Sequence, residues 1–246
     1  MHTNPRPNAL WLERITSYKN TPLSLQSASV LLEKKIERQN ALLKLFKQAT
    51  YVEKLIPKSI TELMLYEARV AKHFWSVYRH LVPKWTTFQH RKPHSEDTVN
   101  ILLDIGYHFL AEQTRSLLEM HEVTLAPALF HVAHKERSEP LVYDVMELFR
   151  TDVVDKTVLS FLRLKKVPMS NVDEQDIQKF VYQLKKALEK KYFLRDFGQC
   201  HTYQYYMELQ ITKFIKAVNH KEVFQPLHLP TRHESRCACN PPQSMT

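Results

Sequence analysis

Glycine is almost absent from this chain: its 246 residues include only 2, Gly106 and Gly198. Sheet-rich folds need many tight turns, and those turns usually recruit glycine. The glycine-rich motifs that cradle phosphates, G-x-x-x-x-G-K-[ST] and G-x-G-x-x-G, are both missing. No segment shows a strong strand or hairpin pattern either. The sequence therefore predicts an all-α protein and argues against a nucleotide-binding enzyme.

Long hydrophobic runs and targeting segments are also missing. No apolar stretch is long and uninterrupted enough to span a bilayer, and the N-terminus lacks the basic, apolar and small-residue order of a signal peptide. The 3 cysteines are an odd number with two in the tail, which is not the pattern of a disulfide framework. These absences predict a cytoplasmic protein with no membrane partner.

Basic charge and hydrophobic residues are, by contrast, plentiful. Hydrophobic residues make up 43% of the chain, enough for a sizeable core. Lys and Arg number 35 against 26 Asp and Glu, a formal net charge of +9. This balance favours a polyanionic partner, nucleic acid first and an anionic membrane second. The alternative is a solvated basic surface with no specific partner.

Apolar residues recur with helical spacing along most of the chain. Helices are expected over about 24–47, 59–82, 96–122, 140–150 with a continuation through 162, a segment containing 177–188, and 202–218. Residues 1–24 look irregular, although their apolar side chains could pack against another part of the protein; these are Leu10, Trp11, Ile15 and Tyr18. The proline-bearing tail from Gln225 looks poorly ordered. The expected organisation is an N-terminal segment 1–24, a helical domain 25–222 and a flexible tail 223–246.

Several residues of the types that commonly bind divalent metals lie in or beside these apolar segments. Glu67 falls within the second predicted helix, and Asp144 and Glu147 are three residues apart and so share one helix face. Burying a carboxylate without a partner is costly, and three such groups could share that cost by binding one cation. The alternatives are that Glu67 pairs with Arg69 or Lys72, that Glu147 pairs with Arg150, and that Asp144 only decorates a helix start.

Two histidines could join these carboxylates. His131 and His134 are three residues apart, so either could reach the same pocket; the alternative is a surface pair beside Lys135 and Arg137. A mixed histidine and carboxylate site would accept Mn²⁺ readily and Mg²⁺ less comfortably, because imidazole is the softer ligand.

Taken together, these segments resemble the helical catalytic domain of the CRISPR-associated integrase, the Cas-one family, which captures spacers during CRISPR adaptation. Four blocks carry the resemblance, in the family's order. They are Lys35-Ile36 with Gln39; Glu67 followed by Trp75; the basic loop Arg91-Lys92-Pro93 with Asp97-Thr98-Val99-Asn100-Ile101-Leu102-Leu103 and Gly106-Tyr107; and His131-Val132-Ala133 with the run from Leu141 to Arg150. The resemblance spans roughly residues 28–165.

The resemblance implies a catalytic metal site of Glu67, His131 and Glu147, with Asp144 beside it and His134 as the alternative histidine. It implies Mg²⁺ or Mn²⁺ as cofactor, and attack of a DNA 3′-hydroxyl on a phosphodiester at a CRISPR repeat. Double-stranded DNA, a second copy of the chain in a homodimer and the small second CRISPR adaptation protein are the implied partners. The candidate contacts to the DNA backbone are Lys35, Arg69, Lys72, Arg91 and Lys92.

The front of the chain departs from the family, which usually begins with a small β-rich dimerisation domain. Residues 1–24 stand where that domain should be ending, so they are interpreted as a linker or a remnant of it. A competing hypothesis is therefore a truncated, non-catalytic helical DNA-binding remnant of the integrase. A third, generic interpretation is a helical protein-interaction domain with a basic face, which leaves the spaced ligand residues as accidents.

Overall fold

The structure is a computed structural model, and it describes residues 7–19, 21–53, 56–131, 139–164 and 172–229. Its elements are α1 (Pro7–Lys19), α2 (Pro22–Leu45), α3 (Ile60–Tyr78), α4 (Thr98–Met120), α5 (Pro140–Met146), the π-helical turn η1 (Thr151–Asp155), α6 (Lys156–Leu164), α7 (Glu174–Glu189), β1 (Lys191–Leu194), the short 3₁₀ turn η2 (Arg195–Phe197), β2 (Gln199–Thr202) and α8 (Tyr203–His220). The predicted all-α class is confirmed.

Polar side chains begin several of these helices where the sequence places them. Ser59 caps α3 by accepting a hydrogen bond from the Glu62 amide, and Asp97 caps α4 in the same way through the Asn100 amide. Proline occupies the first turn of α5, where its missing N–H costs nothing. The long helices therefore start within a few residues of the predicted positions.

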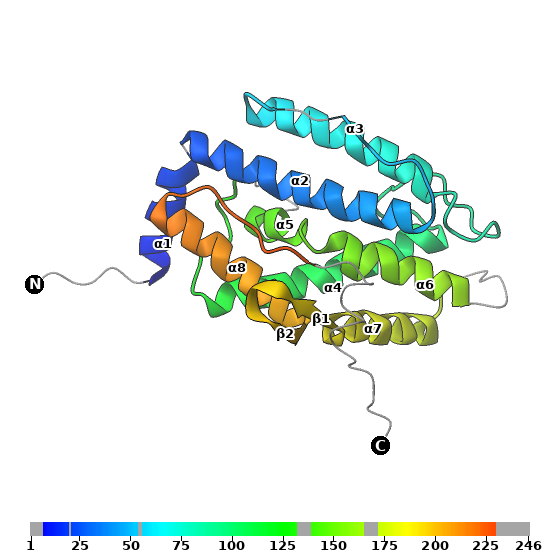
Figure 1. The fold of residues 1–246 in the computed structure, drawn as a ribbon. Helices are drawn as coiled ribbons and strands as arrows, with labels where there is room; N and C mark the ends of the chain where they lie inside the picture. Colours follow the sequence, from blue (N-terminus) through cyan, green and yellow to red (C-terminus); the bar gives the residue numbers. More distant parts are fainter. Residues whose placement is uncertain (1–6, 20, 54–55, 132–138, 165–171, 230–246) are drawn as a thin grey trace, which may run out of the picture.

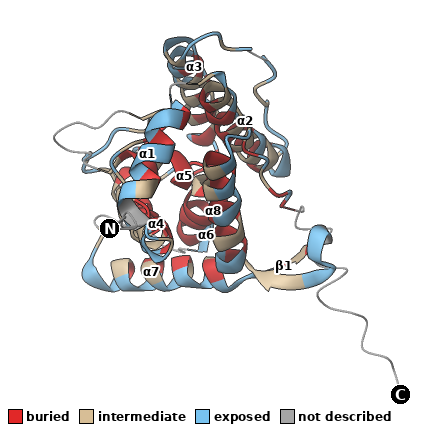
Figure 2. Cartoon of the chain, turned by 90° about the vertical axis from the view of Figure 1, so that its left-hand side faces the viewer, coloured by how far each residue is buried: buried red, intermediate tan, exposed pale blue. Residues whose placement is uncertain are grey.

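Helix α4 forms the centre of the fold. It packs against α5, η1, α6, α7 and α8, while α2 and α3 lie side by side above this group (Figure 1). Buried residues gather where these helices meet, and exposed residues lie on the outer faces (Figure 2). Gly106 of α4 permits a close contact, since a Cβ at this position would clash with the Val154 side chain of η1. The π-helical turn thus sits tightly against the central helix.

Three sequence expectations about the fold were wrong. Residues 7–19 form a helix rather than irregular chain, and Trp11, Ile15 and Tyr18 of this helix are buried in the core. The segment 223–229 is not loose, because Phe224, Leu227 and Leu229 are buried as well.

The third error concerns β structure. Strands β1 and β2 form a small antiparallel hairpin with Lys191 opposite Thr202, and Gly198 lies in its turn with φ near +62°. Cys200 of β2 is disulfide-bonded, which the odd cysteine count did not indicate. In the part of the chain that the structure describes, no helix is long and apolar enough to cross a membrane.

Candidate active site

The side chains of Glu67 and Glu147 converge on one cationic group, the ammonium of Lys35. Lys35 Nζ lies 2.6 Å from Glu67 Oε1 and 3.0 Å from Glu147 Oε2. The three residues come from α2, α3 and the end of α5, so the packing of these elements assembles the group. Around it is a small pocket lined by Ala28, Leu31, Leu32, Lys35, Glu67, Phe130, Asp144 and Glu147.

Charge holds this group together inside a largely buried setting. The side chains of Lys35 and Glu147 are 7% and 9% exposed, whereas that of Glu67 is 27% exposed. Burial alone would raise the pKa of Glu147, but Arg150, Lys35 and His131 outweigh it and hold that pKa at about 2. Burial would likewise lower the pKa of Lys35, and the charges of Glu147 and Glu67 raise it instead.

Glu147 is the most constrained of these residues. It follows the last residue of α5 and forms an ion pair through Oε1 with Arg150, whose guanidinium lies 4.1 Å from the centre of the Tyr107 ring. Its other oxygen, Oε2, is buried and lies 3.0 Å from Lys35 Nζ in an ion pair, and it accepts no well-aligned hydrogen bond from a described residue. One oxygen of a buried carboxylate is thus left facing the pocket without a full partner.

His131 is fixed by Asp144, a fully buried carboxylate in α5. Asp144 accepts hydrogen bonds from the backbone amides of Leu129 at 2.6 Å, Phe130 at 3.0 Å and His131 at 2.8 Å. The His131 Nδ1 atom lies 2.7 Å from Asp144 Oδ1. Because the carboxylate accepts, Nδ1 carries the proton, and the Nε2 atom of a neutral ring keeps its lone pair for another partner.

These contacts decide between the alternative pairings that the sequence left open for Asp144, Glu147 and Glu67. Asp144 does not decorate a helix start; it is buried and holds both the 129–131 backbone and the His131 ring. Glu147 does pair with Arg150, as one alternative stated, but it also meets Lys35. Glu67 pairs with Lys35 and not, among the described contacts, with Arg69 or Lys72. His134 lies outside the described residues.

Glu67, Glu147 and His131 carry carboxylate and imidazole groups of the kinds that bind divalent metals. Among the residues that the structure describes, no three imidazole, thiolate or carboxylate groups already lie in a metal-binding arrangement. Two carboxylates nevertheless point at one cationic centre, and the buried Glu147 Oε2 lacks a donor. The His131 ring is oriented by a carboxylate, as metal-binding histidines commonly are. The carboxylates of Glu67 and Glu147 and the His131 ring are thus chemically suited to a divalent cation, and in this structure the Lys35 ammonium lies between the two carboxylates.

The five basic residues expected to contact DNA differ in their exposure and in whether they already form ion pairs. Lys35 is buried in the pocket, and Arg91 binds Asn100 Oδ1 at 3.0 Å and pairs with Asp104, which fixes the basic loop onto α4. The Arg69 side chain is half exposed, and its Nη2 atom lies 3.3 Å from Glu53 Oε1. Lys72 and Lys92 are exposed, and neither forms an ion pair with another described residue.

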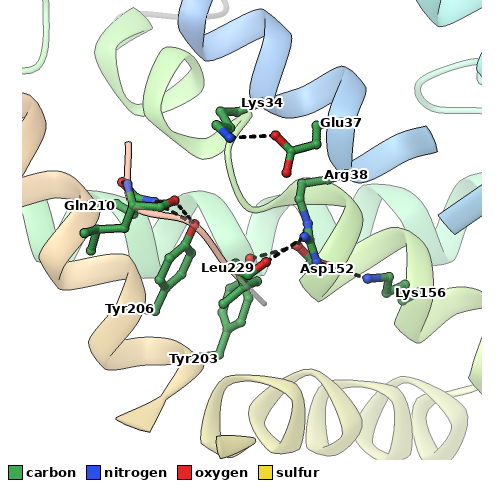
Figure 3. Close-up of polar contacts among 10 residues, drawn as sticks. Lys34, Glu37, Arg38, Asp152, Lys156, Tyr203, Tyr206, Gln210 and Leu229 are labelled. Carbon is green, nitrogen blue, oxygen red and sulfur yellow. Dashed lines mark hydrogen bonds and ion pairs between the residues drawn. The ribbon is translucent and has the colours of Figure 1, made fainter. Parts of the chain in front are cut away.

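A second buried ionic network, which the sequence did not reveal, lies below the C-terminal half of α2 (Figure 3). Arg38 binds both oxygens of Asp152 in η1, at 2.6 and 2.9 Å, and Lys156 pairs with the same carboxylate. Arg38 also donates to the Leu229 carbonyl at 3.3 Å. The only available signal was the spacing of Arg38 one turn after Lys35 on α2.

Comparison with known families supplies the identity of this arrangement. The profile of the family described as "CRISPR associated protein Cas1" matches residues 6–197. The chain belongs to the Cas1 family. The resemblance seen in the four sequence blocks is thereby confirmed, and the CRISPR endonuclease and integrase class follows for the family.

Curated Cas1 relatives match over part of their length. The "CRISPR-associated protein Cas1 3" of Methanobrevibacter ruminantium is 28% identical over 49% of this chain and 36% of the relative. The "CRISPR-associated endonuclease Cas1 1" of Archaeoglobus fulgidus is 25% identical over 50% of this chain and 37% of the relative. The matched part of the chain thus spans a little over a third of these Cas1 proteins.

Solved structures share the fold. A casposase bound to its integration product superposes with a TM-score of 0.75 at 18% identity, covering 90% of this chain and 73% of the casposase. A chain of a "Cas6-RT-Cas1--Cas2 complex" gives a TM-score of 0.72 at 16% identity, covering 94% of this chain and 28% of the other. At these identities the likeness establishes the Cas1 catalytic-domain fold.

Proposed function

We propose that this Cas1 chain is a metal-dependent DNA integrase that joins a short DNA fragment to a CRISPR repeat. The observation that carries the proposal is the convergence of Glu67 and Glu147 on a single cationic point, beside a histidine that Asp144 orients. The buried Glu147 and the partly exposed Glu67 both line one small pocket, and a carboxylate in such a setting needs a cation to compensate its charge.

In the proposed site Glu67, Glu147 and His131 would hold Mg²⁺ or Mn²⁺. Asp144 keeps the proton on Nδ1, and Arg150 holds Glu147 ionised and in place. When bound, the metal supplies polarisation of the phosphoryl oxygen and stabilises the charge that develops there. Packing against Ala28, Leu31 and Phe130 limits the water around these groups. The proposed reaction is a transesterification: the DNA 3′-hydroxyl attacks a phosphodiester of the repeat, a new P–O bond forms, the original P–O bond breaks and its oxygen leaves as a 3′-hydroxyl. One phosphodiester replaces another, so no nucleotide cofactor is needed.

The proposed partners are double-stranded DNA, a second copy of the chain and the small second CRISPR adaptation protein. The formal net charge of +9 supports the first, with Lys72 and Lys92 as the most available phosphate contacts. One of the two solved structures is a casposase bound to an integration product and the other is a Cas6-RT-Cas1–Cas2 complex, and the shared fold supports a similar assembly.

A second candidate function is DNA binding without catalysis. It is favoured by one observation: in the described part of the chain the ammonium of Lys35, rather than a third metal ligand, lies between the two glutamates. A protein that kept this ion pair permanently would bind DNA through its basic surface and join nothing.

A strand-transfer assay separates the two functions. The purified chain is incubated with Mn²⁺, a labelled short duplex with free 3′-hydroxyls and a plasmid carrying a CRISPR repeat. We expect joined product that disappears in Glu67→Ala and Glu147→Ala. Glu33→Ala is the matched control, because Glu33 is an exposed glutamate of α2. Retained DNA binding with no product from the unmodified chain would establish the non-catalytic function instead.

A further inference from the structure

The charges around the pocket are unbalanced in an informative way. The pocket is lined by three carboxylates, Glu67, Asp144 and Glu147, and by one cation, Lys35. Arg150 pairs with Glu147, and Asp155 is a further buried carboxylate that acts on both Arg150 and Glu147. Carboxylates therefore outnumber cations around the pocket, which favours the binding of an added cation.

Lys35 and Arg150 hold the glutamates in different ways. Arg150 is bound to Glu147 and lies over the Tyr107 ring, so its position is fixed from two sides. The Lys35 ammonium is a compact charge at the end of a flexible four-carbon chain. The remaining walls of its pocket include the apolar side chains of Ala28, Leu31, Leu32 and Phe130, so the carboxylates are what keep the ammonium there.

Lys35 also occupies the point at which the two candidate metal ligands meet. Both of its contacts, at 2.6 and 3.0 Å, are to oxygens that a divalent cation would need. An ammonium and a divalent cation cannot share that point, because like charges at such short range repel strongly.

We propose that Lys35 is a positioning residue that alternates between two partners. Before the metal binds, its ammonium holds Glu67 and Glu147 together; the divalent cation displaces it, and the released ammonium then contacts a phosphate of the bound DNA. This inference rests on the proposed metal site, and it assigns Lys35 a role that changes with metal occupancy.

The first test measures Mn²⁺ binding by calorimetry and by thermal unfolding. Lys35→Met removes the competing charge, so Mn²⁺ should bind at least about tenfold more tightly than to the unmodified chain. The same variant should unfold at a lower temperature without metal, since its glutamates lose their cation, and should regain more stability when Mn²⁺ is added. Equal or weaker Mn²⁺ affinity in Lys35→Met would overturn the proposal.

Two further variants control this measurement. Lys34→Met is the matched neighbour, because Lys34 pairs with Glu37 on the surface of α2 and should leave Mn²⁺ affinity unchanged. Lys35→Gln keeps a hydrogen-bond donor for the glutamates without the charge, so it gives the same answer if Lys35→Met does not fold.

The second test measures binding of a short duplex whose 3′ ends lack hydroxyls, so that no joining occurs. With Mn²⁺ present, Lys35→Met should bind this DNA about tenfold more weakly, the usual cost of one charge-assisted hydrogen bond. With EDTA present, its affinity should match that of the unmodified chain, because the ammonium is then occupied by Glu67 and Glu147. An equal loss under both conditions would overturn the released-ammonium role.

Failure of this inference is distinguishable from failure of the proposed function. Mn²⁺ that binds the unmodified chain and Lys35→Met equally, yet requires Glu67, leaves the metal site standing and removes the role of Lys35. Mn²⁺ that binds neither protein refutes the metal site itself, and the proposal for Lys35 with it.

Discussion

Two ionic clusters in this Cas1 chain share helix α2 but have opposite compositions. In the pocket, one cation from α2, Lys35, meets two carboxylates, Glu67 and Glu147. In the second network, one carboxylate, Asp152, meets two cations, Arg38 of α2 and Lys156 of α6 (Figure 3). Arg38 and Lys35 are one helical turn apart, and Asp152 follows Glu147 by five residues.

The difference shows which cluster is available for chemistry. The Asp152 side chain is 2% exposed, and both of its oxygens are bound by the planar guanidinium of Arg38. Lys156 pairs with the same carboxylate, and the Tyr203 hydroxyl donates to it at 3.4 Å, so each oxygen has more than one partner. Glu147 keeps one oxygen without a hydrogen-bond donor, and Lys35 is a single movable charge. A saturated cluster stabilises the fold, whereas a cluster with excess carboxylate can exchange its cation.

The largest expected effect comes from breaking the saturated cluster. Asp152→Asn leaves Arg38 and Lys156 buried or half-buried without their carboxylate, which should lower the free energy of unfolding by about 3–5 kcal/mol. Urea unfolding measures this loss. Glu189→Gln is the control, because Glu189 is an exposed partner of Lys186 and should cost less than about 1 kcal/mol. A loss below about 1 kcal/mol for Asp152→Asn would show that the network is not structural.

Acid should weaken both clusters. The pKa values of Glu147 and Asp152 are each held at about 2, below their ordinary values of 4.5 and 3.8, mainly because neighbouring cations outweigh burial. A depressed carboxylate pKa adds stability above the unfolded pKa that is lost as pH falls toward the folded one. Each group should therefore contribute about 2–3 kcal/mol at pH 6, lost between roughly pH 5 and pH 2.

Equilibrium unfolding as a function of pH tests this and separates the clusters. Asp155 works in the opposite direction, because burial raises its pKa and its protonation in acid recovers stability. Asp152→Asn should show a shallower loss between pH 5 and pH 2 than the unmodified chain. An identical slope would assign the acid sensitivity to Glu147 and other carboxylates.

The smallest of these effects concerns the orientation of His131. Asp144→Asn keeps the shape of the side chain but removes the charge that fixes the proton on Nδ1, so Mn²⁺ affinity should fall about 10–100-fold. Calorimetry measures the loss, and Glu139→Gln, on a half-exposed carboxylate paired with Arg115, is the control. Unchanged Mn²⁺ affinity would mean that His131 is not a ligand.

Much of the fold could be predicted because local signals agreed with tertiary packing. The predicted helices at 59–82 and 96–122 correspond to α3 and α4, since their caps, Ser59 and Asp97, and their apolar spacing are both local properties. Helix α1 was missed because its Trp11, Ile15 and Tyr18 bury themselves only against distant elements. The β1–β2 hairpin was missed because it is short, and its single glycine is a weak turn signal.

The candidate site was predictable as a set of residues and not as an arrangement. Glu67 and Glu147 stood out because carboxylates in apolar helices need compensation, and the structure brings both of them to Lys35. Lys35 and Arg91 were expected to contact DNA, yet the first lies between the glutamates and the second is bound to Asn100 and Asp104. The sequence alone does not show whether a basic side chain forms an ion pair with a carboxylate in the folded protein.

Sequence alone determined the helical class, the Cas1 resemblance and the residues from which a metal site could be built, because periodicity, caps and motif order are properties of the chain in one dimension. The tertiary structure decided which charges meet. Helices α2, α3 and α5 bring together residues as far apart as 35 and 147, so the pairing of Lys35 with two glutamates depends on how these helices pack. Ionic interactions act over a few ångströms of space, whatever the separation along the chain.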